Sequence, residues 1–217
     1  KRAKKALSTI QLLSPDNRKT AFDLDKYEKF MASLAASFDL KNKALENKSF
    51  IEFSIIVANQ IDAYLRLSII MTDQLKNKTN EIDIKYLYQS QTDRPIMERK
   101  IYSLAKEKEI INRALFEQLE SLYLERNKMV HRYIISEFKT RELLEIAYQY
   151  ENICEEVRLI LRDIEDLQFD KKIGIYGNGQ HPHEEPNEDA MKFLHSQVND
   201  KHLMTEFERK ITAPKNV

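Results

Sequence analysis

The chain has 217 residues, in which 35 basic side chains balance 35 acidic ones, and this balance excludes the strong overall field that attracts nucleic acids or membranes. It has three glycines and many Lys, Glu, Leu, Ile and Ala residues, so the composition predicts an all-α protein with one sizeable core. The single cysteine, Cys154, excludes an internal disulfide, and its helical spacing with apolar neighbours predicts a core position. We expect a cytoplasmic location.

The N-terminal part predicts one short and one long helix. Residues 1–13 are basic and could form a short helix, closed by a turn at "SPDN" (14–17). Asp25 and Glu28 have the spacing of a capping box, and apolar residues recur at helical spacing from Tyr27 to Phe38. We therefore expect the first long helix to start near Asp25.

The stretch 50–75 is apolar almost all round, which predicts a helix buried on several sides or at a subunit interface. Its longest apolar run, 53–71, is broken by Asn59, Gln60, Asp62 and Arg66. We expect this run to be too polar to span a bilayer, and no membrane partner is predicted.

A polar connection over 77–94 follows, with an ambiguous segment at 81–88. Asp93 could cap the next helix, with Pro95 in its first turn. Helical periodicity then runs from Ile96 to about Tyr133, with an interruption near 105–109, and Thr140 is expected to cap a last helix that reaches about residue 167.

The composition changes near residue 170, where all three glycines and two prolines gather. We predict an antiparallel helical bundle over 1–170, followed by a linker and a short, partly helical tail over 171–217. Two short helices are expected at 188–200 and 203–210. His181 and His183 lack a third fixed ligand, so no metal site is predicted there.

The segment "ERNKMVHRY" (125–133) places an arginine where a helical bundle normally has an apolar residue. On a helical wheel, four apolar or aromatic side chains fall within about 40° of Arg126: Leu119, Leu122, Val130 and Tyr133. Burying an unpaired guanidinium is costly, so a carboxylate, a phosphate or water must face it.

Asn127 and His131 lie four residues apart and share one flank of the same helix. His131 lies about 140° around the helix from Arg126, so a second copy of the helix, a frayed end or the long arginine side chain must bring the two groups together.

A second polar line lies in the apolar stretch, where Asn59, Asp62 and Arg66 share one helix face. Either Asp62 pairs locally with Arg66, which is the ordinary outcome, or Asp62 supports the site by positioning Arg126.

These residue types suit cleavage of RNA by its own 2′-hydroxyl group. An imidazole exchanges protons near neutral pH, and a guanidinium can stabilise charge on the phosphorane, so neither a metal nor another cofactor is required. Each chain has one such histidine, and a base and an acid would most simply come from two subunits. A homodimer is therefore predicted.

"RNKMVHRY" (126–133) fits R-x-x-x-x-H-x-Y with a polar residue after the arginine, and it resembles the signature of HEPN domains. This all-helical family includes toxin ribonucleases, antiphage effectors and nuclease modules of CRISPR proteins. The resemblance covers roughly residues 20–168. It implies a metal-independent endoribonuclease in which Arg126 and His131 are catalytic, Asn127 supports them, and the paired motifs of a dimer line one cleft.

In one branch of the family, a nucleotidyltransferase antitoxin modifies the tyrosine two residues after the histidine with AMP, which would fall on Tyr133. The tail after 170 and the long 77–94 connection depart from that branch. A core position for Tyr133 is the simpler expectation, because this residue shares the apolar face.

We therefore expect an RNA-cleaving toxin or defence effector that a partner protein holds in check. The alternative is a noncatalytic helical module for dimerisation or interaction. A DNA-binding regulator is disfavoured, because no helix-turn-helix and no basic helix face is recognisable.

Overall fold

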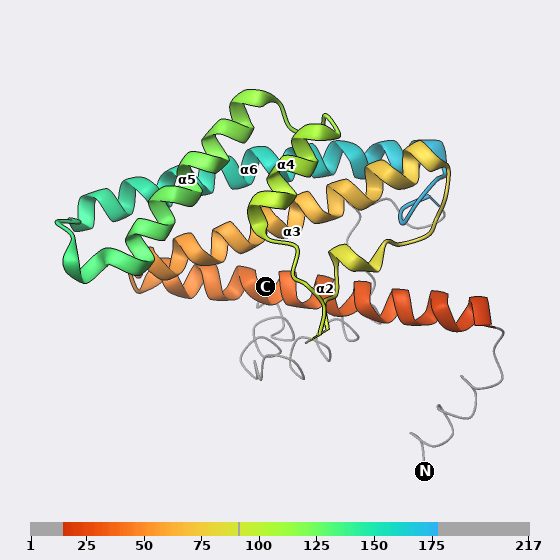
Figure 1. Ribbon diagram of the computed structural model, residues 1–217, viewed down its shortest axis with the longest axis horizontal. Helices are drawn as coiled ribbons and strands as arrows, with labels where there is room; N and C mark the ends of the chain where they lie inside the picture. Colours follow the sequence, from red (N-terminus) through yellow and green to blue (C-terminus); the bar gives the residue numbers. More distant parts are fainter. Residues whose placement is uncertain (1–14, 91, 178–217) are drawn as a thin grey trace, which may run out of the picture.

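The computed structural model describes residues 15–90 and 92–177, and this part of the chain consists of helices joined by turns and loops (Figure 1). The predicted all-α helical bundle is confirmed. The elements in chain order are α2 (Pro15–Glu46), α3 (Phe50–Asn77), the 3-10 turn η1 (Ile84–Tyr86), α4 (Glu98–Glu107), α5 (Arg113–Arg132), the 3-10 turn η2 (Tyr133–Ile135) and α6 (Thr140–Lys171).

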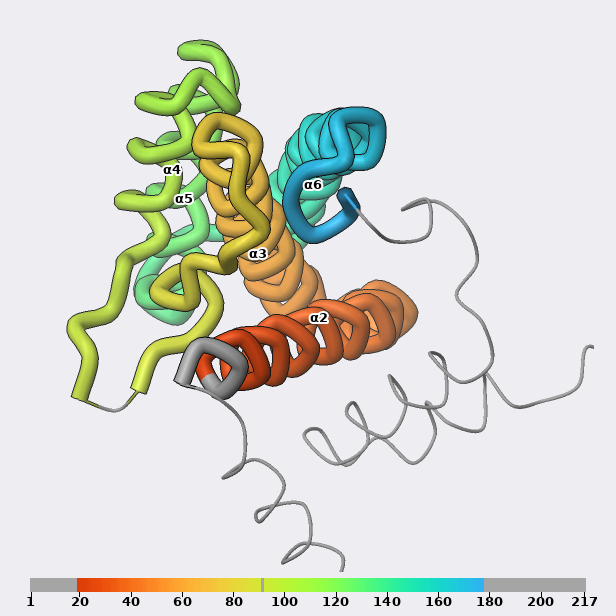
Figure 2. Tube along the Cα trace, turned by 90° about the vertical axis from the view of Figure 1, so that its right-hand side faces the viewer, coloured from red at the N-terminus to blue at the C-terminus, as the bar shows by residue number. Residues whose placement is uncertain are grey.

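Helix α3 is the centre of the bundle, with α2, α4, α5 and α6 around it (Figure 2). Its Ile61, Leu65 and Ile69 side chains are fully buried, which confirms the expected burial on several sides. By length and composition α3 is apolar enough to cross a membrane, contrary to the expectation from its polar residues. However, 67% of that apolar window is buried inside the protein, so packing against the other helices accounts for its apolar character.

Contacts along the helices fix their directions. Gln60 on α3 lies beside Cys154 on α6, and Gln74, further along α3, hydrogen-bonds to Gln168, further along α6. Helices α3 and α6 therefore run in the same direction, so the expected antiparallel arrangement does not hold for this pair. Helix α2 runs against α3 (Figure 1). The burial of Cys154 confirms its predicted core position.

The start of α2 corrects two predictions. The helix is continuous from Pro15, so residues 15–17 form no turn and no new helix starts near Asp25. Proline is tolerated in a first helical turn, where its missing N–H would have no partner. The Asp25 carboxylate instead pairs with Lys29 one turn further on, at 2.9 Å. The helix expected at 1–13 lies outside the described residues.

The predicted break between α4 and α5 is confirmed. Asn112 caps α5, and its Oδ1 atom accepts a hydrogen bond from the backbone N–H of Leu115 at 2.8 Å. The predicted cap at Asp93 is wrong, because α4 starts only at Glu98 and Asp93 accepts a hydrogen bond from the Ser90 backbone instead.

Helix α6 starts at Thr140, one residue after its cap position at Lys139, where the Glu142 carboxylate accepts a hydrogen bond from the Lys139 backbone N–H at 2.7 Å. At its other end the chain folds back on α3, and the Gly174 N–H donates to the Asn80 side chain at 2.8 Å. The division near residue 170 stays a prediction, and the expected tail helices lie outside the described residues.

Candidate functional site

Arg126 lies in α5 with its side chain only 13% exposed, on the helix face that buries Leu119, Leu122 and Met129. This confirms that the arginine interrupts an apolar stripe. A nearly buried guanidinium requires a partner, and the neighbouring helix α4 supplies it.

The partner is Glu98, the first residue of α4. Arg126 Nη1 donates to Glu98 Oε1 at 2.9 Å, and Nη2 lies 2.8 Å from Oε2. The Tyr102 hydroxyl donates to the same carboxylate, and the Tyr123 ring centre lies 4.9 Å from the guanidinium carbon. Burial lowers the pKa of Arg126, but the hydrogen bond and charge of Glu98 outweigh it and raise the pKa above its ordinary value.

Glu98 was missed from the sequence, although a signal for it exists. Glu98 precedes Ile101, Tyr102 and Ala105 at helical spacing, and those three side chains are fully buried. A carboxylate at the head of a buried stripe needs a cation as much as Arg126 needs an anion. Glu98 and Arg126 could therefore have been paired from the sequence, because each places a charge on a buried helix face.

Asp62 and Arg66 form the local pair that the sequence left open. Arg66 Nε donates to Asp62 Oδ2 at 2.6 Å, and the guanidinium also donates to the backbone carbonyls of Tyr86 and Ile96. This corrects the expectation that Asp62 contacts Arg126. Through these bonds, Arg66 instead attaches η1 and the segment that precedes α4 to helix α3.

Asp62 still lies within electrostatic range of the Glu98–Arg126 pair. Burial raises the pKa of Asp62, Arg66 lowers it, and Glu98 and Arg126 have smaller, opposing effects. Asn59 is exposed and lines a small hollow between α2 and α3, and no hydrogen bond joins it to Arg126 within the described part of the chain. The supporting role expected for Asn59 at this site stays a prediction.

Asn127 links Arg126 to the outer surface of α5. Its Oδ1 atom accepts a hydrogen bond from Arg126 Nη2 at 3.4 Å. It also lines a hollow of about 430 Å³ along α5, which we call the His131 hollow. The residues lining this hollow are Ser121, Leu124, Glu125, Asn127, Lys128, His131 and Arg132.

His131 is exposed. It lies on the same flank of α5 as Asn127, as the helical wheel predicts. Among the described contacts, none joins His131 to Arg126, which faces α4 on the inner side. Within one chain, Asn127 is the residue that both contacts Arg126 and lines the hollow of His131.

The end of α5 and the following turn η2 carry apolar side chains that are exposed within the described chain. Tyr133 is 46% exposed, Ile134 94% and Ile135 82%. The expected core position for Tyr133 is wrong, because the buried face passes through Met129 and the α-helix gives way to η2 at Tyr133. Val130 is 41% exposed. We call the exposed residues Val130, Tyr133, Ile134 and Ile135, at the end of α5 and in η2, the α5 outer surface.

Among the described residues, no group of three His, Cys, Asp or Glu side chains is placed to hold a metal ion. His181 and His183 lie outside this part of the chain. The side chains in and beside the His131 hollow offer an imidazole, a carboxamide, the guanidinium of Arg126 and the charged groups of Glu125, Lys128 and Arg132.

The chain matches no protein-family model, and neither a characterised protein nor a solved structure matches it at a significant level.

Proposed function

We propose that the protein is a metal-independent endoribonuclease of the HEPN type, which acts as a homodimer formed through the α5 outer surface. One observation carries the proposal: Asn127 touches the guanidinium of Arg126 and lines the same hollow as the exposed His131. A phosphate in this hollow would also meet Lys128 and Arg132.

In this reaction the 2′-oxygen of RNA attacks the adjacent phosphorus atom, while its proton passes to His131 of one subunit. The departing 5′-oxygen takes a proton from His131 of the other subunit, and a 2′,3′-cyclic phosphate and a 5′-hydroxyl result. A two-fold axis brings two identical surfaces together, which supplies both histidines.

Arg126 would stabilise the negative charge of the phosphorane. A guanidinium has five N–H donors, and the contacts with Glu98 and Asn127 leave some of them for a phosphate. Glu98 would then act as a positioning residue, because it fixes the plane of the guanidinium before substrate binds.

The biological role that fits this activity is that of a toxin or defence effector restrained by a partner protein. A nucleotidyltransferase antitoxin could act on Tyr133, whose ring is partly exposed. A mass gain of AMP units on Tyr133, after incubation with such an enzyme encoded beside this gene, is the expected sign of that pairing.

A noncatalytic interaction module is the second candidate. The Glu98–Arg126 pair by itself accounts for the buried arginine, and the α5 outer surface could serve assembly alone. In that case the histidine would have no chemical role.

Cleavage of single-stranded RNA in the presence of EDTA separates the two candidates. The wild-type protein is expected to release fragments ending in 2′,3′-cyclic phosphate, whereas folded His131→Ala and Arg126→Ala variants are not. Intact RNA after incubation with a folded wild-type dimer would favour the interaction module.

A further inference from the structure

A second hollow lies between α5 and α6 and has a volume of about 300 Å³. Two buried apolar side chains, Leu122 and Ile153, belong to its lining. The other lining residues are four exposed polar ones: Gln118, Ser121, Gln149 and Asn152. We call this hollow the amide groove.

The amide groove has no charged lining residue, although 32% of the whole chain is charged. None of its four polar side chains hydrogen-bonds to another described residue, so their donors and acceptors face the groove or solvent. An anion or a metal ion would find no opposite charge here. A neutral ligand with an apolar face and a polar edge fits better.

A nucleobase is such a ligand. Its flat face can lie on Leu122 and Ile153, and its edge carries both donors and acceptors. Carboxamides match this edge, because each offers a carbonyl acceptor and an NH₂ donor. Asn and Gln read base edges in nucleic-acid complexes for the same reason.

The amide groove and the His131 hollow are neighbours on α5, because Ser121 lines both. Ser121 and His131 are about 15 Å apart along the axis of α5, at 1.5 Å per residue. A few nucleotides of single strand would span that distance. Lys128 and Arg132 line the hollow in which the backbone phosphates would run.

We infer that the amide groove binds one base of single-stranded RNA a few nucleotides away from the phosphate at His131, and so sets the base preference. The inference rests on the proposed function for its ligand class. It adds a specificity determinant on α6, outside the R-x-x-x-x-H-x-Y segment.

Binding of 2′-O-methyl homopolymer oligonucleotides, followed by fluorescence anisotropy, tests the inference without cleavage, because the blocked 2′-oxygen cannot attack. We expect the wild-type protein to bind its preferred homopolymer at least about fivefold more tightly than its poorest one, as a base-edge contact allows. We call the ratio of these two affinities the base contrast. In the Gln149→Leu/Asn152→Leu variant the base contrast should fall to about twofold or less. Asn42→Leu, an exposed amide on α2, should leave it unchanged and is the matched control.

The absence of base contrast in the wild-type protein overturns the inference, and so does a folded double variant that keeps the contrast. A double variant that changes only the oligomeric state also overturns it, because the groove would then be an interface between subunits. Cleavage without base contrast would refute the groove alone, and base contrast without cleavage would refute the nuclease alone.

Discussion

Glu98 and Arg126 form a two-pronged ion pair that joins the first turn of α4 to α5. The two side chains are 19% and 13% exposed, so each has exchanged most of its hydration for the other. Removing one charge leaves the other nearly buried without compensation, which costs more than the intact pair contributes.

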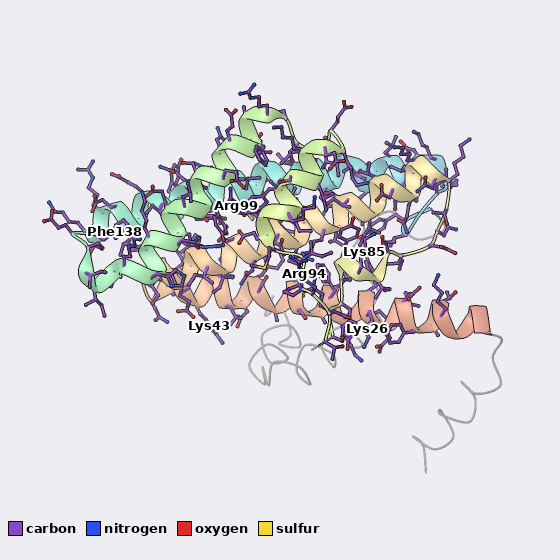
Figure 3. All side chains as sticks on the ribbon, viewed as in Figure 1. Lys26, Lys43, Lys85, Arg94, Arg99 and Phe138 are labelled. Carbon is purple, nitrogen blue, oxygen red and sulfur yellow. The ribbon has the colours of Figure 1, made fainter. Side chains whose placement is uncertain are left out.

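Replacement of Glu98 by glutamine should therefore destabilise the fold by about 1–3 kcal/mol, because Arg126 keeps its burial and loses its counter-charge. Urea unfolding followed by circular dichroism measures this loss. Glu120→Gln is the matched control, since Glu120 pairs with Arg99 across the same two helices, but Arg99 is 56% exposed. Figure 3 labels Arg99. The control should lose clearly less stability, and equal losses would contradict the burial argument.

The main helices could be predicted because burial imposes a period on the sequence. The 50–75 stretch forms α3, and the interruption predicted near 105–109 separates α4 from α5. The cap of α5 at Asn112 was not predicted, although its hydrogen bond to the Leu115 backbone is local. The start of α2 was misplaced because a Pro-Asp pair suits both a turn and a first helical turn. The conformational preferences of Pro and Asp alone do not distinguish a turn from the first turn of a helix.

The sequence alone indicated which charged residue is buried at the candidate site, but not which residue it pairs with. A buried Arg126 demands an anion, yet the choice between Asp62 and Glu98 depends on how α3, α4 and α5 cross. Asp62 has a cation one turn away in Arg66, and that contact forms within a single helix. The exposure of Tyr133 was missed because a helical wheel cannot be extended past the point where the α-helix ends.

Ile134 and Ile135 should hold the proposed dimer together. Burying an isoleucine side chain contributes about 1.5–3 kcal/mol, so an Ile134→Asp/Ile135→Asp variant should weaken dimerisation on the order of 100-fold or more. Sedimentation velocity over a concentration series measures this change. Both side chains are almost fully exposed in one chain, so the fold itself should be unaffected.

Leu24→Asp is the matched control for the dimer, because it places the same charge on an exposed apolar position of α2. It should leave the dimer intact. A wild-type protein that stays monomeric at micromolar concentration, or a double variant that dimerises as well as the wild type, would refute this interface.

Gly174 should not tolerate a side chain. Its φ of +85° is a left-handed conformation, and an added Cβ would lie 2.2 Å from Nε2 of Gln168. Gln168 is fully buried and donates to Met71 O and Gln74 Oε1, so it cannot move without breaking those bonds. Gly174→Ala should cost about 1–3 kcal/mol of unfolding free energy in urea titrations.

A suitable comparison for this glycine is Lys171→Ala, at an exposed position near the end of α6. This change should be close to neutral. If both substitutions had the same effect, the close approach of Gly174 to Gln168 would have no energetic weight.

Glu165 should make the stability of the fold depend on pH. Burial raises the pKa of its carboxyl group to about 7, a hydrogen bond from Tyr176 lowers it, and the charge of Asp166 raises it. The native state therefore favours the protonated form. Its stabilising contribution is complete below the ordinary pKa of 4.5 and disappears as the pH rises through about 7.

The unfolding free energy of the wild-type protein should thus fall between pH 5 and pH 8, and Glu165 should account for about 1–2 kcal/mol of that fall, since solvent screens part of the effect. Glu165→Gln keeps the shape and the acceptor for Tyr176 but cannot ionise, so it should flatten the profile and exceed the wild type in stability at pH 8. Urea titrations at several pH values provide the comparison. Glu156→Gln, exposed on the same helix, should keep the wild-type slope, and an unchanged slope in Glu165→Gln would assign the dependence to another group.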